Sequence, residues 1–208
     1  MFLYSREVTL SSPLALPSAK AISEHLSNVR GRELAVYAPA YSSNWGRIAF
    51  TSWWEDLASL DAALLAASED SKYMELSLGM APYVTGINDR LFNVAFTTST
   101  ETSRPMGNIV WSVDGISVTA KVVEAMGAGA EICTAWKSAT GVDATFGKGV
   151  TGHFGAIGWL SAYDSMSEFE AAQAASSTNE GWIKAVTKSQ DFFRQDIGAG
   201  ISTIYRKM

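Results

Sequence analysis

Three polar side chains are candidates for acid–base chemistry: His153, Arg47 and Tyr37. Histidine titrates near neutral pH, which suits a general base that removes a proton from a substrate. A guanidinium or a phenol can stabilise the negative charge that then develops on an enolate. These residue types predict proton abstraction from a small organic molecule, with His153 as the base and Arg47 or Tyr37 as the group that stabilises the charge.

Each of these candidates also has a purely structural explanation. His153 falls in a predicted hairpin, where a histidine can simply be exposed to solvent. Arg47 lies in an apolar strand, and a buried guanidinium needs a carboxylate, a carbonyl or a ligand anion, so an ion pair with one of the protein's own acids is the alternative to substrate binding. The other histidine, His25, flanks the apolar stripe of a predicted helix and is expected to be a partly buried structural residue.

Aromatic residues offer a second kind of site, an apolar pocket. Large aromatic side chains can line a cavity that holds a small apolar or aromatic molecule, although the same side chains also fill ordinary protein cores. The pocket predicted from the strands and the hairpin consists of Trp53, Trp54, Phe146, Trp159 and Tyr163.

The chain offers little for metal or cofactor chemistry. One cysteine, Cys133, and two histidines cannot supply the three or four ligands of a common metal site, and Cys133 lies in an apolar helical pattern typical of a buried, inert thiol. The glycines at 127–129 and 147–155 lack the strand–loop–helix context of a phosphate-binding loop. We therefore expect no metal and no cofactor.

Composition excludes several other classes. The 208 residues are 47% hydrophobic and 18% charged, as in globular proteins, with a formal net charge of −5 and no basic stripe, so nucleic-acid binding is not expected. The apolar stretch at 57–67 is too short for a membrane span, and residues 1–7 carry charges where a signal peptide is apolar. The lone cysteine favours the reducing cytoplasm.

The elements that must position these side chains occur twice. A shift of 109 residues places residues 46–50 on 155–159 and residues 91–96 on 200–205. His153 then corresponds to Asn44 and Arg47 to Ala156, which indicates that the two copies have diverged. A unit of about a hundred residues is domain-sized. A polar, proline-containing stretch at 99–107 predicts a linker, with one repeat at 1–103 and the other at 104–208.

Each repeat has the predicted order βαββαβ. The expected elements are strands at 3–10, 34–41, 45–54, 91–98, 109–113 and 201–206, a hairpin at 144–163, and helices from 17 to 30, 56 to 67, 71 to 84, 118 to 136 and from 165 onward. This order is the ferredoxin-like arrangement, an antiparallel sheet with its helices on one face. We expect an α+β fold whose two sheets pack face to face as a barrel, or a homodimer in which a second chain covers the sheets.

The segments at 54–63 and 163–172 resemble the dimeric α+β barrel superfamily. In both, a strand ends in an aromatic residue and an acid, Trp54-Glu55 or Tyr163-Asp164, and a helix begins at once, followed later by Tyr73 or Trp182. The pattern is similar to that of NIPSNAP-like, EthD-like and antibiotic-biosynthesis-monooxygenase-like proteins. The resemblance implies a fold that hosts many chemistries, including haem degradation and cofactor-free oxygenation.

The same resemblance argues against one of these chemistries. Haem-degrading members carry an axial histidine on the second helix, at positions that hold Ala63 and Ala172 here. Three functions therefore remain as expectations. The first is a small-molecule-binding protein that can act as a cofactor-free monooxygenase, cyclase or isomerase on an apolar or aromatic substrate. The second is a non-catalytic interaction module, and the third is a haem-binding protein.

Overall fold

The computed structural model describes residues 1–40, 46–100, 106–196 and 200–208. In these residues the elements are β1 (Phe2–Leu10), η1 (Pro13–Ala15), α1 (Leu16–Arg30), β2 (Ala35–Pro39), β3 (Arg47–Trp54), α2 (Leu57–Glu69), α3 (Ser71–Met80), η2 (Ala81–Tyr83), β4 (Val84–Thr97), β5 (Ile109–Ile116), η3 (Thr119–Lys121), α4 (Val122–Thr140), β6 (Ala144–Gly149), β7 (Ala156–Tyr163), α5 (Met166–Ser177), α6 (Glu180–Ser189), η4 (Gln190–Phe192) and β8 (Ile201–Lys207).

The strands form a closed barrel by hydrogen bonding, in the order β1-β3-β2-β8-β5-β7-β6-β4. The pairs β1–β3, β2–β3, β4–β6, β5–β7 and β6–β7 are antiparallel. The predicted α+β class and the closed barrel are therefore confirmed, whereas the duplication of a ferredoxin-like unit stays a prediction.

The chain divides into two compact units, which are described separately. The first contains residues 1–91 together with 206–208, and the second contains residues 92–205. The strands β4 and β8 each contribute residues to both units. The boundary predicted at residue 104 lies outside the described residues, as do Trp45 and the turn at 42–44.

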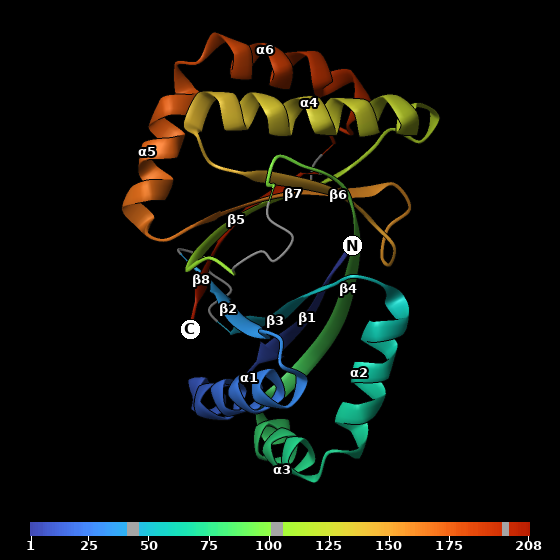
Figure 1. Cartoon of the computed structure of the whole chain (residues 1–208), viewed down its shortest axis with the longest axis vertical. Coiled ribbons are helices and arrows are strands. Elements are labelled where there is room, and N and C mark those ends of the chain that lie inside the picture. Colours follow the sequence, from blue (N-terminus) through green and yellow to red (C-terminus); the bar gives the residue numbers. More distant parts are fainter. Residues whose placement is uncertain (41–45, 101–105, 197–199) are drawn as a thin grey trace. The chain divides into compact units, whose positions relative to one another are not determined.

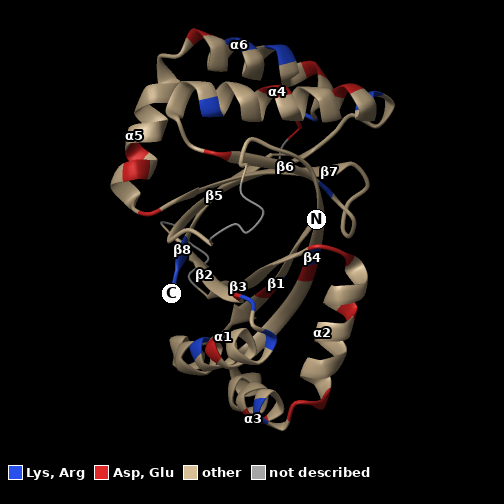
Figure 2. Ribbon diagram, viewed as in Figure 1, with Lys and Arg blue, Asp and Glu red and all other residues tan. Residues whose placement is uncertain are grey.

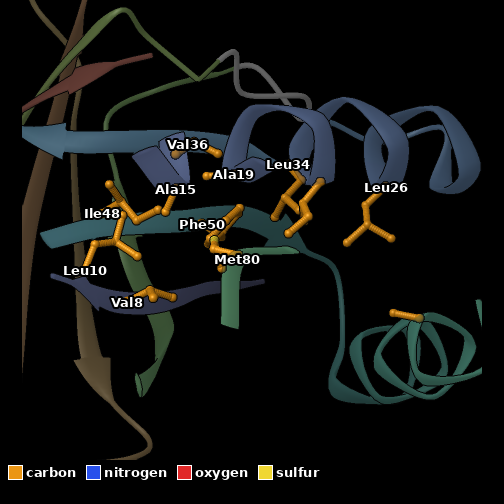
Figure 3. Close-up of a cluster of buried hydrophobic side chains, with 12 residues drawn as sticks. Val8, Leu10, Ala15, Ala19, Leu26, Leu34, Val36, Ile48, Phe50 and Met80 are labelled. Carbon is orange, nitrogen blue, oxygen red and sulfur yellow. The ribbon is translucent and has the colours of Figure 1, made fainter. Parts of the chain in front are cut away.

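In the first unit, α1 and α3 lie side by side next to the strands (Figure 1). Val8, Ile48 and Phe50 of the strands meet Leu26 of α1 and Met80 of α3 in a buried cluster (Figure 3). The apolar stripe of α1 faces this cluster because its residues recur at helical spacing. The helix ends, as predicted, before Gly31, whose φ of 58° lies in the left-handed region that glycine tolerates best.

In the second unit, α4 and α6 lie side by side across β6 and β7 (Figure 1). The buried centre contains Trp136 of α4, Phe146 of β6 and Tyr163 of β7, and each is at most 2% exposed. The predicted hairpin at 144–163 is formed by β6 and β7. Helix α4 begins at Val122 and continues to Thr140, four residues beyond the predicted end.

Side-chain caps begin several of these helices. Asp56 accepts a hydrogen bond from the backbone N–H of Ser59 at 2.7 Å, and Ser165 accepts one from that of Glu168 at 3.2 Å. The carboxylate of Glu168 accepts in return from the N–H of Asp164 at 2.7 Å. These contacts confirm both predicted helix starts, because each satisfies an amide that the helix itself leaves unpaired.

Strand β4 departs most from prediction, since it begins at Val84 rather than at residue 91. Its first half carries the polar residues Asp89 and Arg90, which hide the strand pattern. Both are satisfied by side chains of β1: Asp89 by Arg6, and Arg90 by Glu7.

A second difference concerns His153, which lies in the loop before β7 rather than on a strand.

Charges of both signs are mixed over the helices (Figure 2). None of the helices in the described part of the chain is long and apolar enough to cross a membrane.

Candidate functional site

A cavity of about 350 Å³ lies within the second unit, between strands β5, β6 and β7 and helices α4 and α6. We call it the tryptophan cavity. Its size falls within the range of small-molecule sites. Its lining residues are Trp111, Val113, Ile132, Cys133, Trp136, Ala144, Trp159, Leu160, Ser161, Trp182, Val186, Ser189, Gln190, Phe193 and Gln195.

Four tryptophans reach the cavity from four different elements: Trp111 from β5, Trp136 from α4, Trp159 from β7 and Trp182 from α6. The ring centroids of Trp111 and Trp136 are 4.9 Å apart, and those of Trp136 and Trp182 are 5.0 Å apart. Tilted and edge-on contacts at this distance are favourable for aromatic rings. The three rings therefore form a continuous wall that joins the sheet to both helices.

Hydrogen bonds fix two of the indoles. Trp111 donates from Nε1 to the hydroxyl of Ser202 at 2.8 Å, and Trp159 donates from Nε1 to the carbonyl oxygen of Gly129 at 3.2 Å. The buried Nε1 of Trp136 has no hydrogen-bond partner among the described residues. Such an unsatisfied donor costs about 1–3 kcal/mol in free energy of folding. Hydrogen bonds therefore orient the indoles of β5 and β7, whereas the indole N–H of Trp136 on α4 has no hydrogen-bond acceptor among the described residues.

The lining is neutral. Among the described residues that form it, none is Asp, Glu, Lys, Arg or His. Its polar members are partly used within the protein, since Ser189 donates to the carbonyl of Val186 at 2.7 Å and the amide of Gln195 donates to the carbonyls of Gln190 and Phe193 at 3.1 Å. A charged ligand would enter this cavity without a countercharge, at a high desolvation cost. The lining suits an uncharged aromatic molecule.

The only thiol of the chain, Cys133, also lines the cavity and is fully buried. Burial raises the pKa of Cys133 to about 12. The neutral thiol is a small apolar group and a poor nucleophile, because the thiolate is the reactive form. Cys133 thus contributes an apolar surface to the cavity and not a nucleophile, as its helical pattern predicts.

Haem does not fit this lining. Haem iron needs an axial histidine, thiolate, methionine or tyrosine, and the described lining residues supply only the neutral thiol of Cys133. His25 lies on α1 in the first unit, with Nε2 2.8 Å from the carboxylate of Asp70, and His153 lies in an exposed loop. Within the described residues, no three His, Cys, Asp or Glu side chains come together as a metal site either.

The residues predicted to form a pocket lie in different places. Trp159 lines the cavity, and Phe146 packs against it with ring centroids 5.0 Å apart. Tyr163 is buried in the same core, against Phe169. Trp54 and Trp53 belong to the first unit, where Trp54 is buried, donates to the hydroxyl of Ser52 at 2.8 Å and lies under the guanidinium of Arg32.

Sequence reasoning missed three of the four cavity tryptophans: Trp111, Trp136 and Trp182. A signal for one of them was present. Ile132 and Trp136 are four residues apart on a predicted helix, so they share one face, and this face lines the cavity. The pairing of a helix face with particular strands is a tertiary property, which periodicity alone does not reveal.

The three predicted catalytic residues do not line the tryptophan cavity. His153 is exposed in the loop before β7, where its carbonyl accepts from the N–H of Ala156 at 3.0 Å. Arg47 begins β3, and its guanidinium lies 3.8 Å from the carboxylate of Glu7, the ion-pair arrangement considered above. Tyr37 is 3% exposed, and burial raises the pKa of its phenol above the usual range. Their catalytic roles stay predictions.

The buried carboxylate of Glu7 is held by two cations. Arg90 lies 3.3 Å from it, closer than Arg47. Nearby on the same strand, Arg6 binds Asp89 with two hydrogen bonds of 2.8 Å, and Tyr4 donates to the same carboxylate at 3.1 Å. The Arg6 guanidinium is the main cause that holds the pKa of Asp89 below its usual range. These networks attach β4 to β1 through side chains.

Comparison with known proteins shows the fold. No family model matches the chain, and no curated protein matches it. Among solved structures, an anthrone oxidase-like protein is 15% identical, with 100% of this chain and 91% of that chain covered and a TM-score of 0.65. A protein assigned as a monooxygenase from Fusobacterium nucleatum subsp. nucleatum ATCC 25586 is 10% identical, with 99% and 91% covered and a TM-score of 0.72.

A protein assigned as a chlorite dismutase is also similar, at 10% identity, with 100% and 95% covered and a TM-score of 0.56. This chain shares the fold of these structures. At such low identity the likeness concerns the fold, and function has to be argued from the site.

Proposed function

We propose that this protein binds a small, uncharged aromatic molecule in the tryptophan cavity. The observation that carries the proposal is the convergence of four tryptophans on a space of about 350 Å³ whose described lining residues bear no charge. Flat aromatic surfaces bind fused rings well, because stacking and apolar burial act together. The anthrone oxidase-like neighbour suggests a chemical class to try first, the fused-ring aromatic ketones.

In the enzymatic form of this proposal, the bound molecule loses a proton and the resulting carbanion reacts with dioxygen without a cofactor. The cavity itself supplies binding and orientation, since none of its described lining residues is a strong base. The acid–base roles predicted for His153, Arg47 and Tyr37 are a separate proposal, because none of the three lines the cavity. The alternative, a non-catalytic interaction module, requires no ligand in the cavity.

Three further parts of the proposal rest on sequence patterns or on analogy with the fold. The motifs at 54–63 and 163–172 support kinship with NIPSNAP-like, EthD-like or antibiotic-biosynthesis-monooxygenase-like proteins and a duplicated ferredoxin-like unit. The single cysteine supports a cytoplasmic location. A homodimer is proposed by analogy with the fold, and light scattering tests it.

The test of binding is a calorimetric titration with anthrone as the probe. We compare the unaltered protein with Val186→Phe, which places a ring in the cavity, and with Val123→Phe, which places the same ring on the exposed surface of α4, where Val123 is 82% exposed. We expect binding to the unaltered protein and to V123F, and at least a tenfold loss in V186F. No heat and no thermal shift with anthrone or with a panel of small aromatic ketones would favour the non-catalytic module.

A further inference from the structure

The inference starts from Gly129, a buried glycine in the middle of α4. A Cβ atom built on Gly129 would lie 2.4 Å from two carbons of the Phe146 ring, far inside contact distance. The ring of Phe146, which is fully buried, therefore occupies the space that any other residue at 129 would need. Glycine in a helix interior costs about 1 kcal/mol relative to alanine, so a packing reason of this kind is expected.

Another glycine in the same helix provides a contrast. Gly127 lies two positions earlier, is exposed, and has no atom within 4 Å of a built Cβ. Alanine at 127 would enter open space and favour the helix. The close approach of backbone and ring is thus a property of position 129 and not of α4 in general.

Gly129 influences the position of Trp159 in the tryptophan cavity through two interactions, a hydrogen bond and the packing of Phe146. Its carbonyl oxygen accepts the hydrogen bond from Nε1 of Trp159 at 3.2 Å. Its missing side chain admits Phe146, whose ring centroid lies 5.0 Å from that of Trp159. On a third side Trp159 meets Phe193 edge-on at 5.1 Å. Trp159 lines the cavity, so its ring is positioned from Gly129, Phe146 and Phe193 together.

We propose that Gly129 is a positioning residue that sets the width of the tryptophan cavity at Trp159, and thereby the size of the aromatic molecule that the cavity accepts. The proposal rests on the proposed function, because it names the feature that selects among aromatic ligands. A methyl group at 129 would displace Phe146 toward Trp159 and Trp159 toward the cavity. Close-packed interiors transmit such displacements, since there are few voids to absorb them. The expected consequence is a narrower cavity that discriminates against larger ring systems.

The experiment measures dissociation constants for two uncharged ketones, anthrone with three fused rings and acetophenone with one. The variants are Gly129→Ala and the matched control Gly127→Ala. We expect G129A to weaken anthrone binding about tenfold more than acetophenone binding, the usual effect of a methyl-sized change in an apolar pocket. We expect G127A to leave the ratio of the two dissociation constants unchanged. If Gly129 were needed only for folding, G129A would weaken the binding of both ketones by the same factor.

Two additional measurements complete the test. In the double variant Gly129→Ala, Phe146→Leu, the smaller side chain at 146 makes room for the methyl group at 129. We therefore expect this variant to fold even if G129A does not, and to recover anthrone binding. The NMR signal of the Trp159 indole N–H reports its hydrogen bond without any ligand and should shift in G129A but not in G127A.

The outcomes separate the two ideas. An unchanged ratio in a folded G129A overturns the role of Gly129 while the proposed function stands. If G129A does not fold, a folded double variant that still binds anthrone poorly relative to acetophenone overturns that role, because the returned space should have restored the ratio. Binding of neither ketone to the unaltered protein overturns both.

Discussion

Nε2 of His25 on α1 lies 2.8 Å from Oδ2 of Asp70, the N-cap residue that precedes α3. The other oxygen of Asp70 accepts from the backbone N–H of Tyr73 at 2.8 Å. One carboxylate therefore caps α3 and ties it to α1. The backbone amide of Tyr73 and, second, His25 hold the pKa of Asp70 below its usual range.

The first prediction concerns this double role. Asp70→Ala removes the cap and the contact with His25, whereas Asp56→Ala removes only the cap of α2. We expect D70A to lower the melting temperature by about 4 °C and D56A by about half as much. Thermal unfolding at pH 7 measures both. Equal shifts would show that His25 adds nothing to the cap.

The same carboxylate predicts a pH dependence. Because its pKa is lower in the folded state than in the unfolded chain, Asp70 stabilises the fold above its ordinary pKa, and this stabilisation is lost as the pH falls through the folded value. Asp70→Asn keeps a capping oxygen but cannot titrate. The difference in melting temperature between the unaltered protein and D70N should therefore shrink as the pH falls from 6 to 3. A constant difference would contradict the assignment.

Tyr4 predicts a loss of stability at high pH. Burial raises the pKa of Tyr4 to about 12, whereas the ordinary value is 10. The folded state therefore holds the phenolic proton more tightly, so this stabilisation is complete below pH 10 and declines by up to about 1.4 kcal/mol per pH unit between pH 10 and 12. Tyr4→Phe should flatten that decline and remove one late-titrating tyrosine from the absorbance at 295 nm. An unchanged absorbance titration would place the late phenol elsewhere.

The carboxylate of Glu7 predicts unequal roles for its two cations. Arg90 lies 3.3 Å from it and Arg47 lies 3.8 Å away and is more exposed. Arg90→Ala should lower the free energy of unfolding by about 2 kcal/mol, and Arg47→Ala by about 1 kcal/mol or less. Urea denaturation measures both values. A larger loss in R47A would make Arg47 a structural residue and weaken its proposed role toward a substrate.

Cys133 predicts a masked thiol. With a pKa of about 12, only about one thiol in ten thousand is ionised at pH 8. A disulfide reagent should therefore react with the native protein at least about a hundredfold more slowly than with the protein in guanidinium, where the thiol is exposed. Rapid reaction of the native protein would show that solvent reaches α4 from the cavity.

Local features of this fold could be predicted well from the sequence. The start of α5 at Ser165 and Glu168 depends on neighbours in the chain, and so does the end of α1 at Gly31. The first half of β4 could not be predicted, because the polar residues Asp89 and Arg90 are typical of a loop. Only the structure shows that side chains of β1 pair with them.

The tryptophan cavity shows the same limit for the site. Trp159 was predicted on its strand, but the cavity exists because Trp136 and Trp182 arrive from helices α4 and α6 that pack against that strand. The spacing of residues in the sequence does not reveal that these helices pack against this strand. The polar candidates His153, Arg47 and Tyr37 were chosen for their chemistry, and chemistry alone does not say which side chains share a cavity.

Residues 206–208 belong to the first unit, where the N–H of Met208 donates to the carbonyl of Val36 at 3.0 Å. During synthesis on a ribosome, the first unit therefore acquires its final contacts only after the whole second unit has been made. A nascent chain released at residue 103 would hold its own part of β4 but would lack this contribution from β8. Translation order and assembly order are thus reversed for this part of the molecule, because the first unit is completed only after residues 206–208 have been made.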